Sequence, residues 1–106
     1  MTPNTTTIKE EPSSPIAQGL ERILSSTGRI RILQYLSNNG EANLTDIAKK
    51  TGQSPTATSR HLDQLVETRI VVEKNYGRVR IFKLQTENKR VEQLRDLIVH
   101  WDDLNP

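Results

Sequence analysis

The hydrophobic positions in the first third of the chain predict two consecutive helices. The first set recurs every three or four residues, as one face of a helix requires, and comprises Ile16, Leu20, Ile23 and Leu24. A second set follows and comprises Ile30, Ile32, Leu33, Tyr35 and Leu36. Asn38-Asn39-Gly40 then breaks the pattern, and Gly28 lies near the junction of the two helices. Residues 1–15, rich in Thr and Pro, cannot bury apolar surface and are predicted to form a disordered tail.

The next segment carries the start and stop signals of two further helices. Asn43 can cap a short helix that Gly52 ends after about two turns. Ser54 and Pro55 then open a longer helix over residues 55–67, as N-cap and first-turn residues. Its apolar face comprises Ala57, His61, Leu62, Leu65 and Val66. Two helices joined by a tight glycine turn form a helix-turn-helix.

β-Branched residues replace the helical pattern after Arg69. Residues 70–84 read as an antiparallel hairpin with its turn at Asn75 to Arg78. Residues 87–104 return to helical spacing, with a narrow apolar stripe of Val91, Leu94, Ile98 and Trp101. The chain is therefore predicted to be mainly α with a small antiparallel β-hairpin, in one domain spanning residues 16–104.

Composition limits the class of protein. Of the 106 residues, 33% are apolar, which leaves little material for a large catalytic scaffold. The chain has no cysteine, which excludes disulfide-stapled modules and thiolate metal sites. It also has neither an apolar run of about 20 residues nor a signal peptide, so we expect a soluble, cytoplasmic protein. With no nucleophile-and-base pair and no phosphate-binding glycine loop, we expect neither enzymatic activity nor a cofactor.

The positive charge is concentrated in the middle of the chain. Residues 17–85 carry eleven basic and six acidic side chains, whereas residues 1–16 and 86–106 are both slightly acidic. The net charge of +2 therefore conceals a basic central segment, where a polyanion would bind first.

Residues 44–84 resemble the winged helix-turn-helix domains of the ArsR family of bacterial and archaeal repressors. The matching runs are Leu44–Ala48, Ser54–Leu62, Ile70-Val71 and Gly77–Leu84. The resemblance implies a nucleoid-associated DNA-binding transcriptional regulator, and more specifically a homodimeric repressor. The sequence departs from the family at two points. It lacks the metal-binding cysteine pair expected near Leu44 to Lys50, and it has Arg69 where a glycine usually follows the recognition helix. The arginine must either distort the helix end or accept a left-handed conformation at about 1 kcal/mol.

The chemistry of the longer helix suits a DNA groove. Its polar face carries hydroxyls and one guanidinium, which can bond phosphates and base edges in the major groove. The hairpin carries basic residues that can follow the backbone or enter the minor groove. The residues predicted to contact double-stranded DNA are Thr45, Gln53, Ser54, Thr56, Ser59, Arg60, Lys74, Arg78 and Arg80. The alternatives are a merely solvated helix face and basic residues that protect a sheet edge.

The apolar stripes of the terminal helices are predicted to form a homodimer interface. Its residues are Ile16, Leu20, Ile23, Val91, Leu94, Ile98 and Trp101. The alternative is that these helices pack on each other within one chain. We interpret His61 as a partly buried, hydrogen-bonded side chain, and His100 with its neighbouring acids as a solvated helix end rather than a metal site.

Three functions fit this pattern. The first is a regulator that reads a pseudo-palindromic operator, with helix 55–67 in the major groove and hairpin 70–84 on the backbone and minor groove. The second is an architectural DNA-binding protein with little sequence specificity, and the third is a protein-interaction module. The mixture of Thr56, Ser59 and Arg60 with Asp63 favours base reading over uniform phosphate binding, so the regulator is preferred.

Overall fold

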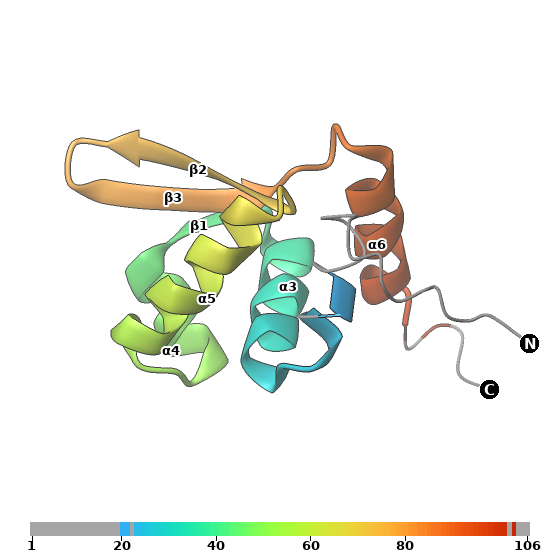
Figure 1. Ribbon diagram of the computed structural model, residues 1–106, viewed down its shortest axis with the longest axis horizontal. Helices are drawn as coiled ribbons and strands as arrows, with labels where there is room; N and C mark the ends of the chain where they lie inside the picture. Colours follow the sequence, from blue (N-terminus) through green and yellow to red (C-terminus); the bar gives the residue numbers. More distant parts are fainter. Residues whose placement is uncertain (1–19, 22, 102, 104–106) are drawn as a thin grey trace, which may run out of the picture.

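The computed structural model describes residues 20–21, 23–101 and 103. The predicted tail and Ile16 lie outside the described residues. Residues 20–21 and 23–24 are helical, and they precede the helices and strands labelled in Figure 1. In chain order these are α3 (Thr27–Asn39), β1 (Glu41–Asn43), α4 (Leu44–Thr51), α5 (Pro55–Glu67), β2 (Val71–Tyr76), β3 (Val79–Leu84) and α6 (Lys89–Val99).

Short-range polar signals set the ends of the two central helices. The Asn43 side chain accepts a hydrogen bond from the Asp46 backbone N–H at 2.8 Å, and α4 begins one residue later. Gly52 ends α4 in the left-handed conformation, with φ 70°. The Ser54 hydroxyl accepts from the Ala57 N–H at 3.1 Å and caps α5, whose first residue is Pro55. The predicted bounds of helix 55–67 are thus confirmed.

The sheet has three strands instead of the two predicted. The strand order is β1-β3-β2, and both pairings are antiparallel. β1 was missed because it is only three residues long and pairs with residues 81–83, far along the chain. The return strand of the hairpin is therefore the central strand of the sheet.

The end of the last helix differs from the prediction. α6 stops at Val99 rather than continuing to Leu104, which lies outside the described residues. The Trp101 N–H bonds to the Ile98 carbonyl three residues back, so the chain tightens into a turn at this point. Trp101 therefore follows α6 and does not lie on it.

The hydrophobic core lies between the sheet and the helices below it. Phe82 of β3 is fully buried in a core cluster that also contains Leu36 of α3, Ile47 of α4 and Leu65 of α5. The wing, formed by β2, β3 and their turn, projects to one side of this core, and α6 lies at the opposite end of the molecule (Figure 1). None of the helices in the described part of the chain has the length and apolarity to cross a bilayer.

Candidate nucleic-acid interface

The exposed side of α5 is polar and faces solvent as predicted. Thr56, Arg60 and Asp63 are exposed and Ser59 is half-buried, and together with Pro55 they line one shallow surface. Ser54 and Thr45 are also exposed, at the first turns of α5 and α4. Five of the residues predicted to contact DNA are therefore exposed, namely Thr45, Ser54, Thr56, Arg60 and, at the wing tip, Arg78. Ser59 is half-buried on the same surface of α5.

Gln53 is the exception among the helix-turn-helix residues. Its side-chain amide donates to the Thr51 hydroxyl at 2.9 Å and to the Gly28 carbonyl at 3.4 Å. The oxygen of the Gln53 amide lies so close to Gly28 that a Cβ at position 28 would overlap it. Such a Cβ would also lie 2.6 Å from His61 Nε2. Gln53 thus holds the turn of the helix-turn-helix against the start of α3, and a side chain at position 28 would have to displace Gln53 and His61.

His61 is partly buried and hydrogen-bonded, as predicted. Its Nδ1 lies 3.1 Å from an Arg29 guanidinium nitrogen, and Arg29 also donates to the Gln64 side-chain oxygen. Burial lowers the pKa of His61, and the nearby charges of Arg29 and Arg60 lower it further. The neutral imidazole can accept a hydrogen bond from Arg29, so the cluster ties α3 to α5 without adding a positive charge.

The predicted wing residues lie on different surfaces of the hairpin. Arg78 is exposed in the turn at the tip. Successive side chains of a strand point to opposite faces, so Arg80 shares the core-facing side of β3 with Phe82 and Leu84, which are both buried. Lys74 pairs with Ile81 and therefore lies on the other face of the sheet. One flat ligand surface cannot contact Lys74 and Arg80 equally.

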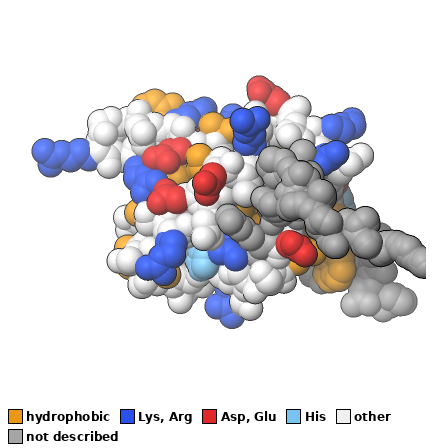
Figure 2. All heavy atoms as spheres, in the orientation of Figure 1, with side chains coloured by type: hydrophobic (Ala, Val, Ile, Leu, Met, Phe, Trp, Pro, Cys, Tyr) orange, Lys and Arg blue, Asp and Glu red, His pale blue; other side chains and the backbone are white. Residues whose placement is uncertain are grey.

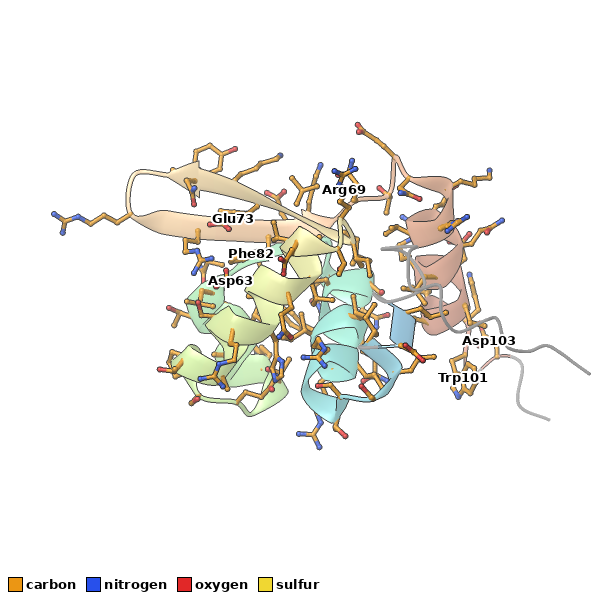
Figure 3. The ribbon with its side chains drawn as sticks, in the orientation of Figure 1. Asp63, Arg69, Glu73, Phe82, Trp101 and Asp103 are labelled. Atoms are coloured by element: carbon orange, nitrogen blue, oxygen red, sulfur yellow. The ribbon has the colours of Figure 1, made fainter. Side chains whose placement is uncertain are left out.

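Arg80 occupies the space between the wing and α5. Its Nε donates to Glu73 at 2.7 Å, its Nη2 to Asp63 at 2.8 Å and its Nη1 to the Ser59 hydroxyl at 3.0 Å. The guanidinium carbon lies 5.1 Å from the centre of the Phe82 ring. Figure 3 shows Glu73 on the wing facing Asp63 on α5, and Figure 2 shows acidic and basic side chains side by side in this region.

The two carboxylates hold Arg80 firmly in its charged state. The hydrogen bond to Glu73 raises the pKa of Arg80 above its usual range, and Asp63 raises it further. Glu73 was not recognised in the sequence as part of the site, although the strand register supplies the signal. Because Glu73 pairs with Phe82, its side chain must lie on the same face of the hairpin as Arg80.

The residues predicted to form a dimer interface are not equally accessible. Ile23 and Val91 are buried in the chain's own core, and Leu94 and Ile98 are partly buried against it. Leu20 and Trp101 are exposed, by 48% and 64%. Leu20 lines an apolar groove together with Ile23, Ile70, Val91, Leu94 and Leu97, whereas Trp101 does not line it. Part of the predicted interface therefore packs within one chain, and the surface left for a partner centres on this groove and Trp101.

His100 lies at the exposed end of α6. Its Nδ1 is 3.1 Å from an Asp103 carboxylate oxygen, which is consistent with a solvated helix end. The described residues bring no three potential metal ligands together.

A helix-turn-helix followed by a two-stranded wing, with a polar recognition helix exposed beside the wing, defines a winged helix-turn-helix domain. Residues 26–73 match the family model described as bacterial regulatory protein, arsR family. The resemblance to ArsR-like regulators is thereby confirmed, and the chain has the winged helix-turn-helix DNA-binding fold of arsR-family transcriptional regulators.

Solved structures agree on the fold. The homodimeric DNA-binding domain of Mb0332 from Mycobacterium bovis, described as a possible ArsR-family regulator, is 23% identical, with a TM-score of 0.67 over 83% of this chain and 79% of that one. NolR from Sinorhizobium fredii is 24% identical, with a TM-score of 0.68 over 89% of each chain. The antimony-specific repressor AntR is 19% identical, with a TM-score of 0.70 over 97% of this chain and 96% of that one. A comparison with curated protein sequences gives no match.

Proposed function

We propose that the protein is a homodimeric repressor that reads a pseudo-palindromic operator in the cytoplasm. In this proposal α5 enters the major groove and the wing tip lies on the backbone or in the minor groove. The observation that carries the proposal is the polar face of Thr56, Ser59 and Arg60 on a capped helix, with Thr56 and Arg60 exposed and Ser59 half-buried, next to a wing whose tip carries Arg78. An arginine on such a helix can bridge O6 and N7 of guanine, which gives sequence preference as well as affinity.

The start of α5 suits a phosphate. Its first backbone N–H groups point out of the helix end, where the helix dipole is positive. Ser54 uses its oxygen to accept from Ala57, so its hydroxyl proton remains available to donate to an anion. Phosphate contacts here and at Arg78 would fix the position of α5 in the groove, while Arg60 reads bases.

A dimer supplies the second recognition helix that an operator of two half-sites requires. The exposed side chains of Leu20 and Leu97, which line the apolar groove, and the exposed Trp101 offer the surface for a second copy of the chain. Mb0332, which has the same fold, is described as homodimeric. Two-fold symmetry would place the two α5 helices about 34 Å apart, one turn of DNA, or a multiple of that distance.

Selection from a random pool of duplex DNA at two salt concentrations tests this proposal. We expect an enriched motif with two inverted half-sites and an affinity that falls steeply with salt. An asymmetric single half-site bound by a monomer would contradict the dimer. A pool with no enriched motif but with salt-dependent binding would instead favour an architectural DNA-binding protein, and no binding at all would favour an interaction module.

A further inference from the structure

The position of Arg80 suggests a role different from that of the other basic residues of the wing. Its guanidinium contacts Ser59 and Asp63 on α5 and Glu73 on β2, so one side chain of β3 joins the recognition helix to both strands of the wing. We propose that Arg80 is a positioning residue that sets the wing against α5 and neutralises two carboxylates at the DNA surface, and that it is not a phosphate contact. This inference rests on the proposed DNA binding.

The strand geometry directs Arg80 away from the outer face of the wing. It lies on the same side of β3 as Phe82, whose buried ring supports the guanidinium at 5.1 Å. Nitrogens at three positions of the guanidinium already donate to protein oxygens, at 2.7 to 3.0 Å. To contact a phosphate directly, Arg80 would have to give up some of these hydrogen bonds. Arg78, which is exposed at the tip of the wing, can reach a phosphate without such a loss.

Charge explains why the recognition surface needs this arginine. Asp63 is 62% exposed and lies three residues after Arg60 on the polar side of α5. Glu73 is more enclosed, with 20% of its side chain exposed, below the wing. Without Arg80 these two carboxylates would face DNA uncompensated, and like charges placed together at an interface oppose binding strongly.

Arg80 also determines which hydrogen bond Ser59 can offer. A hydroxyl has one proton to donate, and the Ser59 oxygen already accepts from Arg80 at 3.0 Å. The Ser59 proton is therefore left to point outwards to an acceptor, such as a phosphate oxygen or the O6 or N7 atom of guanine. Arg80 in this way makes Ser59 a donor in the proposed interface.

A thermodynamic cycle on the selected duplex separates positioning from direct contact. Arg80→Gln is measured in the wild-type background and in the Asp63→Asn/Glu73→Gln background, whose amides keep the shape and an acceptor oxygen without the charge. We expect Arg80→Gln to weaken binding about tenfold or more in the wild type, because it releases the wing from α5 and leaves two carboxylates without their counter-charge. In the neutralised background these ion pairs are already absent and only one positive charge is lost, so we expect a change of less than about threefold, no larger than that of Lys83→Gln in the same background.

The matched control is Lys83→Gln, which removes a positive charge from the same strand on its other face, opposite Val72. Its effect should be the same in both backgrounds. A loss for Arg80→Gln that is equal or larger in the neutralised background would show direct contact with DNA and overturn the proposal, as would no loss in the wild type. Wild-type protein that binds no duplex would instead overturn the proposed function, and this inference with it.

Nuclear magnetic resonance provides a test without DNA. The Nε–H of Arg80, which donates to Glu73 at 2.7 Å, should exchange with water more slowly than the Nε–H of exposed Arg78. The Glu73→Gln substitution should speed the exchange of Arg80 and leave that of Arg78 unchanged. Equal, fast exchange of both arginines in the wild type would mean that Arg80 is not held between the wing and α5, and would overturn the proposal.

Discussion

Replacing Arg69 by glycine should stabilise the protein, although it removes a charged side chain and adds no contact. Arg69 has a φ of 67°, and it is the only residue other than glycine with a positive φ in the described part of the chain. Its N–H donates to the Val66 carbonyl at 2.9 Å and the next N–H, of Ile70, to the Leu65 carbonyl at 3.0 Å. This pattern ends many helices and requires a left-handed residue at the position of Arg69. The left-handed alternative predicted from the sequence is confirmed.

The size of the effect follows from two opposing terms. The left-handed conformation costs a non-glycine residue roughly 1 to 2 kcal/mol. Glycine avoids this cost but loses more backbone freedom on folding, by roughly 0.5 to 1 kcal/mol. The net stabilisation from Arg69→Gly is therefore about 0.5 to 1 kcal/mol, and for a domain of this size it raises Tm by about 2 to 8 °C.

Thermal and urea unfolding followed by circular dichroism, at one fixed protein concentration, measure this difference. Arg69→Ala is the matched control, because it removes the same side chain but keeps the backbone strain, so its stability should stay near that of the wild type. Thr68→Gly, at the preceding position with a φ of −86°, should destabilise the protein. If Arg69→Gly is no more stable than Arg69→Ala, the strain argument is refuted.

Three further predictions concern DNA binding, assembly and pH. Arg60→Ala should relax the preference at one base position at a cost of about 1 to 3 kcal/mol of binding free energy, and equal losses on selected and random duplexes would show that Arg60 does not read bases. Arg78→Ala should instead weaken binding to all sequences and reduce the slope of log affinity against log salt concentration by about 1. Trp101→Ala should cost about 2 kcal/mol or more of dimer stability, measured by sedimentation equilibrium, and should lower operator affinity with it. Val79→Ala, which changes an exposed residue of the wing, should leave the dimer unchanged, and a Trp101→Ala dimer as stable as the wild type would contradict the prediction. Folding lowers the pKa of His61, so the unfolded chain binds the proton of His61 more tightly than the folded chain does. The free energy of urea unfolding should therefore be highest above about pH 6.5 and fall below it, and His61→Gln should flatten this decline.

The helix-turn-helix could be predicted closely because its signals are local. The caps Asn43 and Ser54, with Gly52 between them, act within three or four residues of their own positions, so the sequence pattern alone determines where α4 and α5 begin. Thr58 was missed as a buried residue because a threonine reads as polar. Its hydroxyl donates to the Ser54 carbonyl at 2.8 Å, and that internal bond permits full burial.

The features that the sequence did not reveal depend on contacts between distant residues. The pairing of β1 with β3 joins two segments on either side of the helix-turn-helix, and nothing in the short run from Glu41 to Asn43 indicates a partner. The grouping of Arg80 with Asp63 likewise depends on how the wing crosses α5. Basic residues in a hairpin looked alike in the sequence, whereas the strand pairing separates the tip residue Arg78 from the enclosed Arg80.

The asymmetric pairing of β3 gives the wing the mechanics of a cantilever. Residues 81–83 are hydrogen-bonded to strands on both sides, whereas Val79 and Arg80 pair with β2 alone. Bending stiffness should therefore fall from the clamped base to the free tip, and the tip can follow a minor groove whose width varies with sequence. Arg80 lies just beyond the residues of β3 that pair on both sides, and its hydrogen bonds to Ser59 and Asp63 attach this part of the wing to α5. These bonds therefore determine how much of the wing, with Arg78 at its tip, can bend freely.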